Sequence, residues 1–455
     1  LMYFEVMIAS LSCGITASMT CADAYPLFAA CYNKQQSADA FASFCRNFAY
    51  LKEARTGNVT SAMDRAPPNA KMQPNVQLVG LGSKQAVDCQ AVVCALKDVY
   101  SPLQSVPKSV DLSEYGLLTR PKDQLKCGSC WAFGTVAALE NAILRSESLP
   151  PFWAAQRSAL NLSELFLGVN TRGSANFCDG GDFYYAINYI SQTKQTVELA
   201  TNFAYNQTNV DAYKAIFRNG GSVKPKLQAQ EQFQPFQTFG EQQIPLISLH
   251  YMYDAPNYTF NATVRTQIKS YLAKGIAVVG GMFINTDASK FYSYSGGILE
   301  GKCSSQWLDH QVVIVGYGKK EGRDVWMLRN SYGVNWGHEG YFYVPVGENA
   351  FCTEMEAEVI IPKSFNNTVF TNFNKQRSYW QLSADYSLVD NDGSIGPASF
   401  YISTEMIIIV AAGGVLLVLG VCVAAICIIS RKANNNNGQN MREIVIIESK
   451  SKIIE

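Results

Sequence analysis

The 455-residue chain is poor in charge and in histidine, and both shortages narrow what it can be. Charged residues make up 16% and apolar residues 48%, whereas roughly 25% charge is typical of soluble proteins. A disordered chain needs the opposite balance. The 37 basic and 37 acidic residues cancel, so no basic field attracts nucleic acid and we expect no such partner. Imidazole chemistry has only His250, His310 and His338 to use.

Charge is entirely absent from one long apolar run, residues 406–429. About 20 apolar residues suffice to cross a bilayer, and a core helix is rarely apolar on every face over such a length. Arg431 and Lys432 follow the run at once. The positive-inside rule therefore predicts a single-pass type I membrane protein, with a transmembrane helix after a stalk (364–405) and before a cytosolic tail (430–455).

The beginning of the chain is consistent with entry into the secretory route. Residues 6–19 form a moderately apolar segment, and Ala22-Asp23-Ala24 is a small-x-small cleavage pattern. We expect residues 1–24 to be a signal peptide, with a buried N-terminal helix as the alternative. The region before the span would then face a lumen or the cell exterior, at the surface or in an endolysosomal or vacuolar compartment, with its cysteines mostly paired. Six glycosylation sequons agree with this route, at Asn58, Asn161, Asn206, Asn257, Asn261 and Asn366.

Three separated segments carry the residues that indicate chemistry. The first reads Cys127-Gly128-Ser129-Cys130-Trp131, which matches the signature around the nucleophile of papain-type proteases. An amphipathic pattern follows it, and a cysteine at a helix N-terminus is favoured as the reactive thiolate. The alternative is a metal half-site formed by Cys127 and Cys130, but no second pair with ligand spacing exists. We therefore expect no metal and no cofactor.

The second segment, 308–318, is an apolar strand with His310 near its start, and the third, 326–337, contains Asn330. Together the three segments resemble the papain family of cathepsin-like cysteine peptidases, over residues 105–363. The resemblance implies an α+β, papain-like fold of two subdomains, one helical and one β-barrel-like, in addition to the transmembrane helix. It also implies catalytic roles for Cys130 as nucleophile, His310 as base and acid, Asn330 as its orienting partner and Gln124 as oxyanion donor.

The same resemblance implies two disulfides, Cys127–Cys178 and Cys303–Cys352, and leaves Cys130 unpaired. His310 lies 180 residues after Cys130, whereas the family norm is about 130–150. The chain therefore carries extra residues between the two, and we expect a surface insertion near 206–257.

Substrate contacts are also implied by the resemblance. They fall at Gly180, Gly181, Phe183, Gln311 and Ala357. An apolar residue is favoured at the second position before the scissile bond (P2), and a basic one stays open there because Glu356 adjoins Ala357. No histidine lies between Cys130 and Cys178, so the histidine loop of carboxydipeptidase relatives is absent, which favours an endopeptidase acting on proteins or peptides.

Residues 25–104 would be an autoinhibitory propeptide or, alternatively, a permanent domain. A helix over residues 38–55 is predicted by apolar residues on one face, namely Phe41, Phe44, Phe48 and Leu51. Two bridges of open connectivity are expected among Cys31, Cys45, Cys89 and Cys94.

Three residues depart from the family pattern: Tyr332 replaces a tryptophan, Leu125 a glycine and Gln311 a small residue. These departures keep a second hypothesis open, an inactive papain-like membrane receptor or adhesion protein. A zinc-binding membrane protein is a third. The four intact catalytic positions favour a membrane-anchored cysteine endopeptidase that works through an acyl-enzyme intermediate.

Overall fold

The computed structural model describes residues 13–54, 57–67, 103, 105–145, 160–171, 177–193, 197–218, 246–247, 262–304, 308–355 and 357–360. The predicted stalk, transmembrane helix and tail lie outside these residues, as does His250. Within them, no helix combines the length and apolar character needed to span a bilayer. The membrane anchor therefore stays a prediction.

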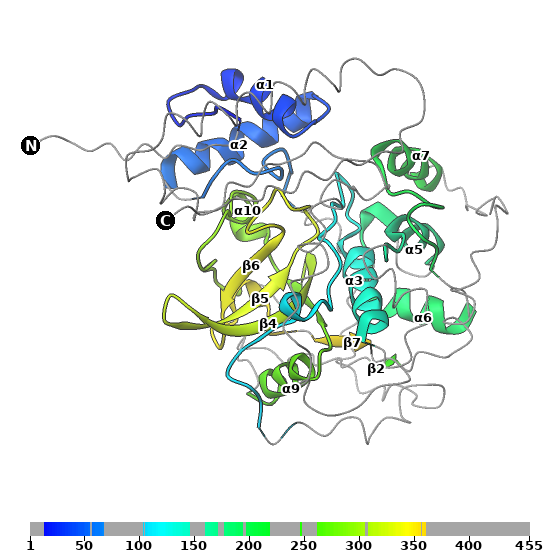
Figure 1. The fold of residues 1–455 in the computed structure, drawn as a ribbon. Helices are drawn as coiled ribbons and strands as arrows, with labels where there is room; N and C mark the ends of the chain where they lie inside the picture. Colours follow the sequence, from blue (N-terminus) through cyan, green and yellow to red (C-terminus); the bar gives the residue numbers. More distant parts are fainter. Residues whose placement is uncertain are drawn as a thin grey trace, which may run out of the picture. The chain divides into compact units, whose positions relative to one another are not determined.

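Helix α3 (Cys130–Arg145) lies at the centre of the catalytic region. Every side chain from Trp131 to Arg145 is buried, because strand β4 packs on one side of it and helices α5 and α6 on the other (Figure 1). The remaining helices of this region are α5 (Glu164–Asn170), α6 (Phe183–Thr193), α7 (Gln207–Arg218), α9 (Ala262–Ala273) and α10 (Ala288–Tyr292). Short 3-10 turns occur at Leu112–Tyr115, Phe177–Asp179, Asn285–Asp287 and Ala350–Cys352.

The strands form one antiparallel sheet in the order β2-β7-β3-β4-β5-β6, and β1 pairs with β4. Their bounds are β1 Val110–Asp111, β2 Leu246–Ile247, β3 Val278–Met282, β4 His310–Lys320, β5 Arg323–Arg329, β6 Tyr341–Pro345 and β7 Glu358–Ile360. Strand β4 is buried from His310 to Tyr317, as expected for an apolar strand with neighbours on both sides. The predicted α+β class is confirmed.

The segment expected as a surface insertion includes two elements that contact the rest of the catalytic region, helix α7 and strand β2. Helix α7 buries Val210, and Tyr213 and Phe217 pack beside it in a cluster that also contains Cys127 and Cys178. Positions 210, 213 and 217 share one helical face. Strand β2 pairs with β7. The residues between these two elements lie outside the described ranges.

The N-terminal residues form a small helical unit of their own. Helix α1 (Cys21–Cys31) packs on α2 (Ala38–Ala54), and the two share an aromatic core that includes Phe28, Phe44 and Phe48. Phe41, expected on the buried face of α2, is 37% exposed. The predicted helix is therefore present, with a narrower apolar face than the sequence indicated.

Two disulfides in this unit differ from the expected pairing. Cys13 is bonded to Cys31 and Cys21 to Cys45, whereas bridges were expected among Cys31, Cys45, Cys89 and Cys94. The helical hairpin brings Cys21 and Cys45 side by side, a contact that spacing along the chain does not reveal. The expected cleavage after Ala24 falls inside α1 and would separate Cys13 and Cys21 from their partners along the backbone. Processing at that point is at odds with this fold.

Candidate active site

Cys130 is the first residue of α3, and the loop before it is fixed on both sides. Cys127 is bonded to Cys178, and the Gly128 N–H donates to the Cys178 carbonyl at 2.8 Å. These are the same partners that the family resemblance implies, and Cys303–Cys352 is the second such pair. Because Cys127 is bridged, it cannot form a metal half-site with Cys130. Cys130 is a free, partly exposed thiol.

His310 and Asn330 meet across two neighbouring strands. His310 begins β4 opposite Met282 of β3, and Asn330 follows the last residue of β5. The Nε2 atom of His310 lies 2.7 Å from Oδ1 of Asn330. An imidazole held at Nε2 by an amide oxygen carries its proton there, which leaves Nδ1 as the atom that can exchange a proton with a thiol. The structure brings the predicted pair together.

Aromatic rings enclose this imidazole. The Tyr332 ring lies 5.1 Å from the His310 ring with a tilt of 36°, and Phe291 lies 5.6 Å away on an edge. Trp336 packs against both Phe291 and Tyr332. Tyr332 therefore covers the imidazole although it replaces the usual tryptophan, so this departure does not open the His–Asn contact to water.

Gln124 is held by a network that sequence reasoning did not identify. Its Nε2 donates to the Cys127 carbonyl at 2.7 Å, using one of its two hydrogens. Its Oε1 accepts from the Ser331 hydroxyl, which fixes the amide orientation. The buried Tyr205 hydroxyl donates to the Gln124 carbonyl at 2.8 Å and lies 2.7 Å from Ser129 Oγ. Ser331 adjoins Asn330 in the third segment, whereas Tyr205 is 81 residues from Gln124 and gives no local signal.

Leu125 lies in the left-handed backbone region at φ 52°, which explains why a glycine is usual here. Its N–H donates to Asp123 Oδ1 at 2.8 Å, the hydrogen bond of an Asx-turn. The loop that carries Gln124 thus holds Leu125 through the Asp123 side chain.

Burial keeps the nucleophile and the imidazole neutral in this form of the chain. Burial raises the pKa of the Cys130 thiol to about 11, although the Gln311 and Trp131 backbone N–H groups oppose it. Burial also lowers the pKa of His310 to about 4, against the bond to Asn330 and with a smaller contribution from Arg65. The thiolate–imidazolium pair is thus disfavoured while the site is covered.

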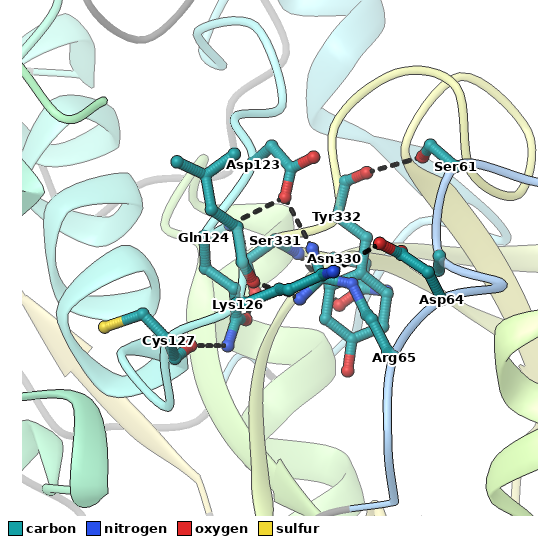
Figure 2. Close-up of polar contacts among 12 residues, drawn as sticks. Ser61, Asp64, Arg65, Asp123, Gln124, Lys126, Cys127, Asn330, Ser331 and Tyr332 are labelled. Atoms are coloured by element: carbon teal, nitrogen blue, oxygen red, sulfur yellow. Dashed lines mark hydrogen bonds and ion pairs between the residues drawn. The ribbon is translucent and has the colours of Figure 1, made fainter. Parts of the chain in front are cut away.

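The cover comes from residues 58–66 of the N-terminal unit. The Thr60 hydroxyl donates to the Tyr292 carbonyl at 2.6 Å, and the Tyr292 hydroxyl donates to the Ala66 carbonyl at 2.8 Å. Figure 2 shows Ser61, Asp64 and Arg65 lying beside Tyr332 and the Gln124 loop. This segment is therefore packed directly on the imidazole side of the site.

The predicted substrate-binding residues have different environments. Gly180 and Gly181 are partly exposed, and a side chain at Gly181 would collide with Trp131 at 2.4 Å. Gln311 is 8% exposed and its Oε1 has no hydrogen-bond partner. Ala357 is buried just before β7, and Phe183 is 1% exposed in the main core. Both side chains belong to the main core in this form of the chain, and their contact with substrate stays a prediction.

No group of three or more potential metal ligands occurs within the described ranges. A free thiol, an amide-bound imidazole and an oriented glutamine amide are the components of nucleophilic acyl transfer.

Comparison with known proteins agrees with this class of site. The model of the family described as "Papain family cysteine protease" matches residues 106–363, more than half of the chain. The chain belongs to the papain family of cysteine proteases.

Similar curated proteins include Cathepsin L of Sarcophaga peregrina, 31% identical over 253 residues, which are 54% of this chain and 61% of that protein. Vignain of Ricinus communis is 29% identical over 275 residues, covering 59% and 64%. This chain thus matches less than two thirds of the length of these relatives.

Two solved structures share the fold. A structure on the mite allergens Blo t 1 and Der p 1 has a TM-score of 0.53 at 19% identity, covering 74% of this chain and 98% of that one. The digestive procathepsin L2 proteinase of Tenebrio molitor has a TM-score of 0.50 at 21% identity, covering 75% and 99%.

Proposed function

We propose that the chain is a cysteine endopeptidase that hydrolyses peptide bonds through an acyl-enzyme intermediate. The observation that carries this proposal is the 2.7 Å contact between His310 Nε2 and Asn330 Oδ1, beside an unpaired Cys130 at a helix N-terminus. Cys130 would attack the substrate carbonyl while His310 takes the thiol proton. The second hydrogen of Gln124 Nε2 and the Cys130 backbone N–H would stabilise the oxyanion.

His310 would next donate its proton to the leaving amine, and water would release the acyl group. Gly180 and Gly181 would pair their backbone with an extended substrate. Ala357 and Gln311 would line the neighbouring pocket, which favours an apolar residue there and leaves a basic one open.

Residues 58–66 and the helical hairpin before them would act as an inhibitory propeptide. The support is their contact with Tyr292, Tyr332 and the Gln124 loop. Removal of this unit would expose the site and permit the thiolate–imidazolium pair to form.

The test is labelling of the acid-treated protein with a peptidyl epoxide probe, followed by mass mapping. The proposal predicts modification of Cys130 that is lost in His310→Ala. No labelling, once removal of the N-terminal unit is verified, would contradict it and favour the inactive receptor or adhesion protein.

A membrane location is part of the proposal. The apolar residues 406–429 and the basic residues after them support a type I anchor, with the catalytic region in a lumen or outside the cell. Resistance of the protein to carbonate extraction, with residues 430–455 accessible to a protease from the cytosol, is the expected result. Release into the soluble fraction would contradict it.

A further inference from the structure

Arg65 reaches the catalytic region through three different contacts. Its Nη2 donates to Asp123 Oδ1 at 2.6 Å, and its Nη1 donates to the Leu125 carbonyl. Its guanidinium carbon lies 4.1 Å from the centre of the Tyr332 ring. The Arg65 side chain is 9% exposed and the Asp123 side chain 23%. The planar fork therefore uses separate N–H groups for two acceptors, while its face stacks on an aromatic ring (Figure 2).

The groups that hold Arg65 are fixed by bonds within the catalytic region itself. Asp123 forms an antiparallel bridge with Tyr332, and its Oδ1 also accepts the Leu125 N–H. The Gly333 N–H donates to the Lys122 carbonyl at 3.0 Å, next to this bridge. None of these bonds involves the N-terminal unit, so the site is expected to persist when that unit leaves.

The electrostatic environment of the Asp123 carboxylate also indicates a cation-binding site. Burial alone would raise the pKa of Asp123, but the Arg65 guanidinium and then Lys34 outweigh it and lower the pKa. Both of these cations come from the N-terminal unit. Once they depart, these two cations no longer offset the Asp123 charge, and a cation from another chain can take their place.

The position of this site relative to the chemistry follows from His310. The imidazole protonates the leaving amine, so the leaving part of a substrate must lie on the His310 side. Tyr332 lies 5.1 Å from the His310 ring, and the guanidinium lies 4.1 Å from the Tyr332 ring. An extended chain advances about 3.3–3.6 Å per residue. One or two substrate residues after the scissile bond, together with the length of an arginine side chain, can therefore span from the His310 ring to the position of the Arg65 guanidinium.

We propose that Asp123, the Leu125 carbonyl and the Tyr332 ring form a subsite for an arginine side chain in the first or second substrate residue after the scissile bond. In this form of the chain Arg65 occupies the subsite. The inference rests on the proposed endopeptidase function and adds a substrate class to it, peptides with arginine on the leaving side.

The geometry discriminates between arginine and lysine. A guanidinium presents several N–H groups in a plane and stacks on an aromatic face, whereas an ammonium is a compact, strongly hydrated point charge. Lysine can reach the carboxylate but cannot make all three contacts together. We therefore expect arginine to be preferred over lysine, and lysine over a neutral side chain.

The test compares internally quenched peptides that differ at one position after the scissile bond. Arginine is compared with citrulline, its uncharged isostere, and with lysine, first at the first position and then at the second. The enzyme is the full-length chain activated by acid, as wild type and as Asp123→Asn. Asparagine keeps the oxygen that accepts the Leu125 N–H, and the citrulline peptide measures how much active enzyme each preparation contains.

At one of the two positions, the wild type should cleave the arginine peptide with a kcat/KM about tenfold or more above that of the citrulline peptide, since charge-assisted hydrogen bonds are the stronger ones. In Asp123→Asn this ratio should fall towards one. Equal cleavage of all peptides by the wild type would overturn the subsite and leave the endopeptidase proposal intact. A ratio unchanged by Asp123→Asn would also overturn it. No cleavage of any peptide, together with no epoxide labelling of Cys130, would overturn both proposals.

Discussion

The two sides of the candidate site are built from different interactions. On the nucleophile side, a disulfide and polar contacts fix the loop around Gln124 and Cys130. On the imidazole side, His310 makes one short hydrogen bond to Asn330 and is otherwise packed among rings. Polar contacts set the direction of donors, whereas packed rings exclude water. Substitutions on the first side should therefore alter positioning, and those on the second should alter protonation.

The largest effect is expected on the imidazole side. His310→Ala removes the group that we propose accepts the Cys130 proton and donates it to the leaving amine. We expect kcat/KM to fall by about 10⁴-fold, near the upper range for general acid–base catalysis. Hydrolysis of a quenched peptide by acid-activated protein measures this. Activity within tenfold of wild type would show that His310 is not the base.

The next largest effect is expected on stability, from a substitution in a buried charge cluster near the nucleophile side. Lys122 Nζ lies 2.9 Å from Glu140 and 2.6 Å from Glu164, and all three side chains are at most 7% exposed. Lys122→Met leaves two buried carboxylates unpaired, so we expect a loss of about 3–5 kcal/mol in the free energy of unfolding. Denaturant unfolding measures it.

The matched control replaces Lys122 by Met together with Glu140→Gln and Glu164→Gln. This triple variant removes the charges as well as the partner, and it should recover most of the loss. A single variant as stable as wild type would show that the cluster does not contribute in this way.

The pH dependence of stability tests the environment of Asp309, which adjoins His310 on the imidazole side. Burial raises the pKa of Asp309 to about 6, although the Ile284 and Asn285 N–H groups oppose it. The folded form then binds a proton more tightly than the unfolded form, so stability is highest below the unfolded pKa and falls as pH rises to about 6. Asp309→Asn removes this contribution and leaves that of His310, whose lowered pKa makes stability rise with pH over the same range. The free energy of unfolding should therefore rise more steeply between about pH 4 and pH 6 than in the wild type. A variant with the same slope as wild type would contradict this.

Tyr205→Phe should have the smallest of these effects and belongs to the nucleophile side. It removes the hydroxyl that joins the Gln124 carbonyl to Ser129 but keeps the ring that packs on Phe133. We expect kcat to fall about tenfold with KM little changed, since one buried hydrogen-bonding group is worth about 1–2 kcal/mol. A change in KM alone would indicate a contact with substrate. Tyr213→Phe on nearby helix α7 is the matched control and should behave as wild type.

Much of the site was predictable because most of its residues lie in short, contiguous sequence motifs. The pentad around Cys130, the strand that begins at His310 and the segment around Asn330 each have a local pattern, and the α+β class is implied by the family that they resemble.

The contacts missed from the sequence join residues far apart in the chain. Arg65 and Asp123 are 58 residues apart, and Tyr205 and Gln124 are 81 residues apart. No periodicity connects such positions, since their contact depends on how separate elements pack. The bridges of Cys13 and Cys21 were missed for the same reason.

The most direct test of the account is the rate of Cys130 alkylation as a function of pH, before and after removal of the N-terminal unit. In the intact chain the account predicts slow reaction and a thiol pKa well above 9. After removal it predicts fast reaction at neutral pH, with a low apparent pKa that returns to the range of an ordinary thiol in His310→Ala. A Cys130 that titrates as an ordinary thiol in the processed wild-type protein would contradict the central claim that the N-terminal unit covers an assembled Cys–His pair.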